Sequence, residues 1–233
     1  MNTTGTIPKA AFLVIALSVL VLGIDSVLAE GQPDLPTISV VGDNVSYSGQ
    51  LTPEGFALLR DATAGKQIRS LTIRSGGGEI GAGMDFGFWT FDNKLDVIVS
   101  EGCFSSCANY VFPAGERKTI LAGAVVAWHG SALQQSFETE SSLRKELERS
   151  YKREKKTLSK EQEDVDLGKL AANLQTLKVR QAEFFRKIGV DEYVTRIGQE
   201  KFGAKGFYFL SVEDMARFGI KNVVAPDDYP KRI

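Results

Sequence analysis

Short apolar runs separated by glycines and turn residues fill the chain from about residue 37 to residue 130. Runs that alternate apolar and polar positions predict strands, whereas the longer mixed stretches between them predict helices. We expect strands at residues 37–41, 44–47, 70–74, 96–100, 119–121, 125–128, 206–210 and 221–224, and helices at residues 52–62, 79–92, 106–111 and 211–218. The repeated order of strand, glycine turn and helix predicts an α/β protein with parallel strands joined by right-handed crossovers.

A second pattern covers residues 136–186, which are rich in Glu, Lys, Gln and Leu and contain no proline. This composition predicts a long helical region. Its most charged part, residues 141–163, is typical of a solvated helical face. The alternative is an arm that pairs with another copy of the chain, and we expect a homo-oligomer.

The first thirty residues differ from the rest. Lys9 precedes an apolar run over residues 10–24, and Val27-Leu28-Ala29 has the small residues that precede a signal-peptidase cut. We therefore expect a signal peptide over residues 1–29, a linker over 30–36 and one domain over 37–233. The protein would then be periplasmic or secreted. An uncleaved membrane anchor is the alternative, although the run is shorter than the roughly 20 residues that span a bilayer.

Composition narrows the classes of function. The chain has 233 residues, 43% of them apolar, with 28 basic and 29 acidic residues and a net charge of -1. That balance excludes a chain-wide basic surface for nucleic acid, and the length suits one domain. Export would place the two cysteines, Cys103 and Cys107, where a disulfide persists. Two buried free thiols are the alternative. One histidine and two cysteines make a poor zinc set, so we expect neither metal nor cofactor.

Three segments carry candidate chemistry. The first, Ser75-Gly76-Gly77-Gly78, follows a strand and precedes a helix, where glycines can aim N–H groups at a developing oxyanion. The second runs from Gly102 to Ala108, with Ser105 and Ser106 at a turn between a strand and an apolar helix. Such a serine is either a helix cap or a nucleophile near the positive helix end. The third is His129, the single histidine, at a strand end and thus the one histidine available as a general base.

These segments, in this order, resemble the proteolytic subunits of Clp protease and the wider ClpP/crotonase superfamily. That family has a Ser-Pro-Gly-Gly turn, a Gly-x-x-x-Ser elbow and a later histidine at a strand end. Here Ser75 to Gly78 matches the turn with Gly76 in place of proline, and Gly102 to Ser106 matches the elbow. The resemblance covers residues 70–129 well and residues 209–224 loosely. It implies a fold of repeated strand–strand–helix units arranged as a spiral.

The resemblance also implies roles for single residues. Ser106 would be the nucleophile, His129 its general base, and the N–H groups of Gly77, Gly78 and Cys107 the oxyanion hole. The reaction would be hydrolysis of a peptide bond in a peptide or protein substrate through an acyl-enzyme.

One alternative shifts the nucleophile by one residue. Cys103 and Cys107 bracket the serines as in periplasmic relatives with a Cys-x-Ser-x-Cys elbow, and in that register Ser105 is the nucleophile. Whichever serine is the nucleophile, we expect a Cys103–Cys107 disulfide in the exported protein.

The expected acid of a triad is missing. The family has a carboxylate before a Phe-Leu-Ser segment, whereas here residues 206–208 (Gly-Phe-Tyr) precede that segment. Asp85, Glu213 or Asp214 could orient the imidazole from elsewhere, or a backbone carbonyl could do so. A non-catalytic binding or assembly protein on the same fold is therefore the main alternative function. An acyl-CoA enzyme is a third, disfavoured because acyl-CoA is intracellular.

Overall fold

The computed structural model describes residues 35–134, 137 and 139–230. The expected signal peptide and most of the expected linker lie outside these residues. Within them, no helix is both long enough and apolar enough to cross a membrane.

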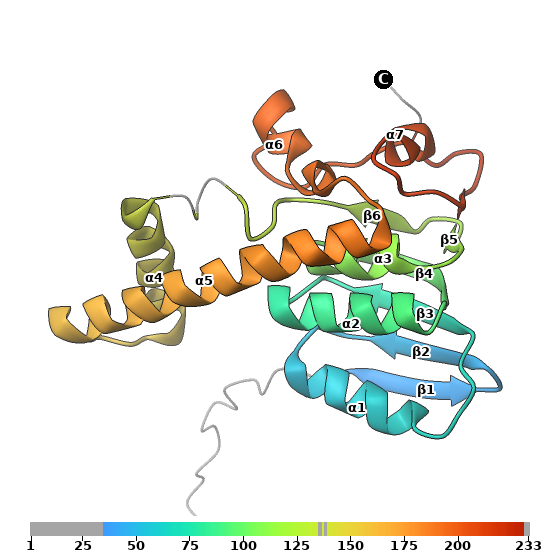
Figure 1. The fold of residues 1–233 in the computed structure, drawn as a ribbon, viewed down its shortest axis with the longest axis horizontal. Coiled ribbons are helices and arrows are strands. Elements are labelled where there is room, and N and C mark those ends of the chain that lie inside the picture. Colours follow the sequence, from blue (N-terminus) through green and yellow to red (C-terminus); the bar gives the residue numbers. More distant parts are fainter. Residues whose placement is uncertain (1–34, 135–136, 138, 231–233) are drawn as a thin grey trace, which may run out of the picture. The chain divides into compact units, whose positions relative to one another are not determined.

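A mostly parallel sheet of seven strands organises the described part of the chain (Figure 1). Its strands are β1 (Thr37–Val41), β2 (Asn44–Ser48), β3 (Ser70–Ser75), β4 (Asp96–Phe104), β5 (Lys118–Ile120), β6 (Val125–Ala127) and β7 (Val223–Val224). The strands follow the order β1-β2-β3-β4-β5-β7, and β6 also pairs with β4. Strands β1 and β2 form an antiparallel hairpin, and the remaining pairs are parallel. The expectation of an α/β protein with parallel strands is confirmed to that extent.

The described helices differ in length, and several of them begin at a side-chain cap. They are α1 (Pro53–Thr63), α2 (Ile80–Asp92), the π-helix η1 (Cys107–Val111), α3 (Phe112–Ala114), α4 (Glu140–Glu154), α5 (Lys160–Ile188), the 3-10 helix η3 (Glu192–Thr195), α6 (Ile197–Phe202) and α7 (Val212–Arg217). Thr52 caps α1 by accepting from the Gly55 N–H, with Pro53 at the first helical position as expected. Ser211 caps α7 in the same way, accepting from the Asp214 N–H.

The core lies between the sheet and the helices packed on it. Alternate residues of β3 and β4, including Leu71, Ile73, Val97 and Val99, are fully buried, as the period of a strand requires. Helix α2 contacts both α1 and α5, so the three helices lie side by side along the sheet (Figure 1). Buried aromatic residues of α2 and α5, such as Phe184 of α5, complete this layer.

Strand β4 is longer than expected, and its path determines where the candidate residues lie. An irregularity in the β3–β4 pairing falls between Ile73 and Ser75. The first half of β4 pairs with β5, whereas its last residues pair with β6, ending with Phe104 opposite Ala127. Because β4 and β6 are parallel, the residues that follow both strands meet at one edge of the sheet.

The long helical region that the composition predicts is divided into two helices. It breaks at Lys155, whose backbone is left-handed with φ 52°, and α5 begins after the cap Ser159. The break lets α4 fold back on α5, so that Leu143 of α4 packs in a small apolar cluster with Leu167 and Leu174 of α5. Burial of these leucines stabilises the arrangement in which α4 packs against α5. The composition of the segment does not show which leucines will meet.

The tail also differs from its expectation in one place. Residues 206–210 do not form a strand. Only Tyr208 pairs with the sheet, through an antiparallel bridge in which it exchanges backbone hydrogen bonds of 3.0 and 2.8 Å with Trp128. Both aromatic rings lie at this bridge and stack, with centroids 6.4 Å apart. The bridge therefore holds the tail beside the residue that precedes His129.

Candidate active site

Ser105 and His129 meet at the edge of the sheet where β4 and β6 end. The His129 Nε2 atom lies 2.7 Å from the Ser105 Oγ atom, within hydrogen-bonding distance. The Ser105 N–H donates to the Ala127 carbonyl at 3.0 Å, which continues the β4–β6 pairing by one residue. The pairing of two parallel strands thus sets the distance between two side chains that are 24 residues apart in sequence.

The backbone of Ser105 has an uncommon conformation. Its φ of 54° is left-handed, a region that a residue other than glycine enters at a cost of about 1–3 kcal/mol. Such a turn between a strand and a helix projects the serine hydroxyl away from both elements, as a nucleophile elbow does. The left-handed backbone distinguishes Ser105 from Ser106, whose φ is -58°.

Ser106 has a different environment from the one expected of a nucleophile. Its side chain is only 2% exposed, and its hydroxyl donates to the Gly78 carbonyl at 2.8 Å. The contact with His129 that the first sequence expectation gave to Ser106 is made by Ser105 instead. The reason is the left-handed turn at Ser105, after which the chain enters the helix and the next side chain faces inward.

The glycine turn lies directly against this elbow. A Cβ atom on Gly77, whose φ is 96°, would lie 2.7 Å from the Ser105 Cβ atom and 3.0 Å from the Ser106 nitrogen. On Gly78 it would lie 2.2 Å from the Leu51 carbonyl oxygen, so neither position has room for a side chain. The turn is held at the elbow by Leu51, whose N–H donates to the Gly77 carbonyl at 2.8 Å.

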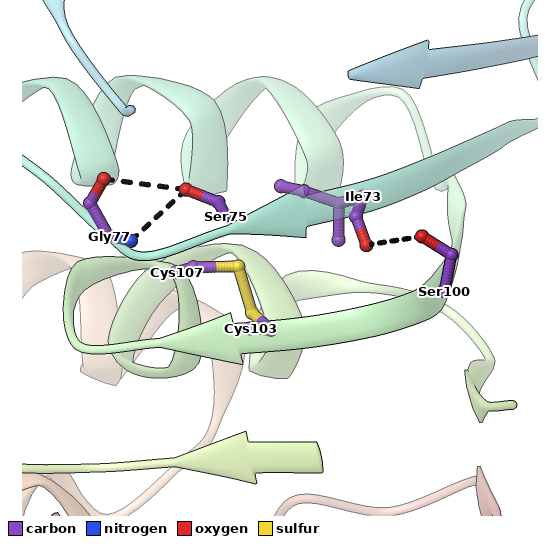
Figure 2. The surroundings of a disulfide bond; sticks show 6 residues. All are labelled: Ile73, Ser75, Gly77, Ser100, Cys103 and Cys107. Atoms are coloured by element: carbon purple, nitrogen blue, oxygen red, sulfur yellow. Dashed lines mark hydrogen bonds between the residues drawn. A yellow bond between two sulfur atoms is a disulfide. The ribbon is translucent and has the colours of Figure 1, made fainter. Parts of the chain in front are cut away.

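The Gly77 N–H is engaged within its own turn. It donates to the Ser75 Oγ atom at 3.1 Å, and that hydroxyl lies 3.4 Å from the Gly77 carbonyl oxygen (Figure 2). Ser75 is buried and therefore fixes the turn from inside. Of the three residues expected at an oxyanion hole, Gly77 and Gly78 lie beside the elbow. The N–H that directly follows Ser105 belongs to Ser106 rather than to Cys107.

The expected disulfide between Cys103 and Cys107 is confirmed. It joins the end of β4 to the start of η1, with the two Cα atoms 5.2 Å apart (Figure 2). Both cysteines are fully buried. The cross-link closes a small ring around Ser105 and Ser106, which restrains the elbow between its two anchoring elements.

The imidazole of His129 is half-buried, and burial lowers its pKa below the ordinary value of 6.5. A hydrogen bond to its own backbone carbonyl acts in the opposite direction on the pKa. The ring packs edge-on against Phe207, with centroids 4.7 Å apart, and Phe207 also contacts Phe104. Among the residues that the structure describes, no carboxylate hydrogen-bonds to the imidazole.

Of the three carboxylates considered from the sequence, Asp85 and Asp214 lie in other contacts, and no contact between Glu213 and His129 is seen among the described residues. Asp85 forms an ion pair with Arg180 of α5. Asp214 accepts hydrogen bonds from Ser211 and Arg217 of its own helix, α7. The tail segment that carries the acid in the resembling family instead places Phe207 on the imidazole, held there by the bridge at Tyr208.

Two residues that sequence reasoning missed hold the backbone around His129. Gln199 of α6 donates its Nε2 hydrogen to the His129 carbonyl at 2.5 Å. Asn109 of η1 donates its Nδ2 hydrogen to the Gly130 carbonyl at 2.7 Å. The spacing of Asn109, four residues after Ser105 in a helical segment, is a signal that could have flagged it. Gln199 carries no comparable signal.

A cavity of about 550 Å³ opens beside His129. Glu146 and Arg149 of α4 line one side of it, and Gln199 and Lys205 line another. Glu146 and Arg149 form an ion pair with a separation of 2.6 Å. The charged helix α4 therefore lines part of the cavity next to the imidazole.

Comparisons with known proteins give only a weak structural similarity. No family model matches the chain, and a search of curated proteins found no match. Among the solved structures that match is a protein described as an enoyl-CoA hydratase from Rhodopseudomonas palustris CGA009. It is 14% identical, with a TM-score of 0.32, and the match covers 41% of this chain and 49% of that one. The chain thus spans about half the length of that structure, and nothing about activity follows from the similarity.

Proposed function

We propose that this protein is a serine hydrolase that cleaves peptide bonds, with Ser105 as nucleophile and His129 as general base. The observation that carries the proposal is the 2.7 Å contact between Ser105 Oγ and His129 Nε2, formed by a serine in a left-handed turn. A nucleophile within hydrogen-bonding distance of a half-buried imidazole is the arrangement that acyl transfer requires.

The steps follow from this geometry. His129 Nε2 takes the Ser105 proton as Oγ attacks the substrate carbonyl, and the imidazolium then protonates the leaving amine. The resulting acyl-enzyme is hydrolysed by a water that His129 deprotonates in turn. The Ser106 N–H lies at the start of the helix, where the helix dipole favours negative charge, and serves the oxyanion. The Gly77 N–H lies beside the elbow but donates to Ser75 Oγ, so it is not assigned to the oxyanion.

The setting of the reaction is part of the proposal. The cavity of about 550 Å³ that His129 lines leaves space for a substrate segment beside the imidazole. Export to the periplasm or beyond is supported by the apolar run over residues 10–24 and by the Cys103–Cys107 disulfide, since disulfides persist in oxidising compartments.

A fluorophosphonate probe tests the proposal, because it reacts covalently with activated serines. We expect the mature protein to be labelled and the Ser105→Ala variant to lose labelling completely. Ser106→Ala is the matched control. It keeps the hydroxyl that contacts His129 and loses only the hydrogen bond to Gly78, so labelling should persist at a reduced rate. Intact-protein mass spectrometry and peptide mapping would identify the modified residue.

The alternative function is a binding protein on the same fold. It is favoured by one specific observation: the Phe207 ring packs edge-on against His129, whereas no carboxylate among the described residues hydrogen-bonds to the imidazole. Absence of labelling in folded wild-type protein would support this alternative. Loss of labelling in Ser106→Ala with full retention in Ser105→Ala would contradict our assignment of the nucleophile.

A further inference from the structure

The peptide groups around His129 are each held by a partner from a different part of the chain. Tyr208 pairs with the backbone of Trp128, the Gln199 amide donates to the His129 carbonyl, and the Asn109 amide donates to the Gly130 carbonyl. Three consecutive residues are thus fixed although β6 ends before them, at Ala127.

Asn109 connects the two halves of the candidate site. Its backbone N–H donates to the Ser105 carbonyl at 2.8 Å, while its side-chain amide donates to the Gly130 carbonyl at 2.7 Å. The residue is 1% exposed, and its Oδ1 atom is buried without a hydrogen-bond partner in the described part of the chain. A buried amide oxygen without a hydrogen-bond partner destabilises the folded state, so the donation to Gly130 is kept at an energetic cost.

Gln199 acts on the other carbonyl. It lies in α6, a short helix whose last turn is closed by the Gly203 N–H donating to the Gln199 carbonyl at 3.1 Å. Its side chain is half-buried between the helix and the end of β6. The contact fixes the plane of the peptide bond between His129 and Gly130. That plane restricts the directions in which the imidazole can point from its Cα atom.

We propose that Gln199 and Asn109 are positioning residues for the imidazole of His129. By donating to the backbone carbonyls of His129 and Gly130, they provide the orientation that a carboxylate bound to the ring provides in a triad. The inference rests on the proposed function for its catalytic meaning, but the orientation of His129 can be measured without catalysis. Two neutral amides hold the base in place, while Phe207 fills the position beside the ring.

This arrangement has a chemical consequence. A carboxylate on the imidazole both orients it and stabilises the imidazolium that forms during attack. Neutral amides on the backbone supply the orientation without the charge. The base therefore stays weak, in keeping with the lowered pKa of half-buried His129.

Because His129 is the single histidine of the chain, the positioning can be read directly by NMR. Protein labelled with ¹⁵N-histidine and purified without a histidine tag gives one imidazole, whose pH titration and tautomer report on its environment. We compare the wild type with Gln199→Met, which keeps the side-chain length but cannot donate. We expect the titration midpoint to rise toward 6.5 and the ring signals to show increased mobility, because the released ring is better solvated.

Gln175→Met is the matched control, since Gln175 is an exposed residue of α5 distant in sequence from this contact. It should leave the titration unchanged. Asn109→Leu is a second variant, which removes the donation to Gly130 but keeps the backbone bond to Ser105. Thermal unfolding of each variant shows whether it is folded at the temperature of the NMR measurement.

A second readout separates positioning from catalysis. The rate of fluorophosphonate labelling should fall by about tenfold or more in Gln199→Met, because a misplaced base costs reactivity. If the wild type is not labelled but the NMR shift occurs, the proposed function fails and the positioning stands. If titration, tautomer and mobility are the same in Gln199→Met, Gln175→Met and the wild type, the positioning role is wrong.

Discussion

At the scale of single residues, the two adjacent serines show how one backbone angle separates two roles. The left-handed φ at Ser105 directs its hydroxyl to His129, whereas Ser106 faces inward toward Gly78. The sequence contains both serines in equivalent chemical contexts, and no propensity distinguishes them. The two cysteines that bracket them were the sequence feature that favoured Ser105.

The lowered pKa of His129 predicts a pH dependence with a defined sign. The imidazole accepts a proton from Ser105 only when neutral, so the labelling rate should fall as the pH drops through its pKa. Since burial holds that pKa below 6.5, the midpoint of the fall should lie below pH 6.5. Labelling rates measured from about pH 4 to about pH 8 test this expectation.

The same shift affects stability. The unfolded chain protonates His129 near its ordinary pKa of 6.5, whereas the folded chain does so only at lower pH. As the pH falls through this interval, the unfolded state binds more protons than the folded state, so the free energy of unfolding decreases. His129→Gln should remove this part of the acid destabilisation. A labelling midpoint above 6.5 would contradict both expectations.

At the scale of elements, the disulfide joins a strand to the helix that follows it. The cross-link spans a sequence separation of 4 and lies wholly inside the core. In such a short ring the loss of unfolded-state entropy is modest. It nevertheless acts on the one segment where the chain must change from strand to helix through a left-handed residue.

Removing the cross-link should lower the free energy of unfolding by about 2 kcal/mol, the chain-entropy value for so short a ring. The measurement is urea unfolding of the Cys103→Ala/Cys107→Ala variant, followed by circular dichroism. Wild-type protein reduced under denaturing conditions and refolded with reductant is the control, because it loses the bond but keeps both side chains. Equal midpoints for oxidised and reduced wild type would show that the ring contributes no stability.

Much of the element pattern could be predicted from the sequence because it depends on local chemistry. The cap at Thr52, the glycine turn and the alternating strands all follow from short-range rules, and their bounds agree within a few residues. The break at Lys155 and the single bridge at Tyr208 could not be predicted. Both depend on which distant side chains find a partner.

The candidate site divides in the same way. The segments that carry His129, Gly77 and the disulfide could be recognised because their residue types and order are uncommon. The choice between Ser106, the first expectation, and Ser105, its alternative, depends on a backbone angle that the sequence does not show. Gln199 could not, because a glutamine in a polar helix is ordinary until its amide is seen to reach the His129 carbonyl.

At the scale of the whole molecule, helix α5 connects the two sides of the site through one buried amide. Gln181 is fully buried and accepts a hydrogen bond of 2.6 Å from the Tyr110 hydroxyl. Its Nε2 atom donates to Ser131 Oγ at 3.3 Å. Tyr110 belongs to the helix after Ser105, and Ser131 lies two residues after His129. Burial strongly raises the pKa of Tyr110, which therefore remains a neutral donor.

Replacing Gln181 with leucine should destabilise the protein by about 1–3 kcal/mol, because the Tyr110 hydroxyl is left buried without its acceptor. Urea unfolding of Gln181→Leu measures the change. Gln175→Leu is the control, since it makes the same substitution on an exposed position of the same helix. Equal stability of the two variants would mean that the buried amide does not hold α5 to the site.

The ring closed by Cys103 and Cys107 also determines what proteolysis can do at this position. Every peptide bond between the two cysteines, including those on either side of Ser105, lies within a covalent loop. A cut there adds one water molecule but releases no fragment, so the two halves of the chain remain a single molecule until the disulfide is reduced. Protein cleaved at the elbow would therefore migrate with intact protein on a non-reducing gel. It would separate into two fragments only after reduction of the disulfide.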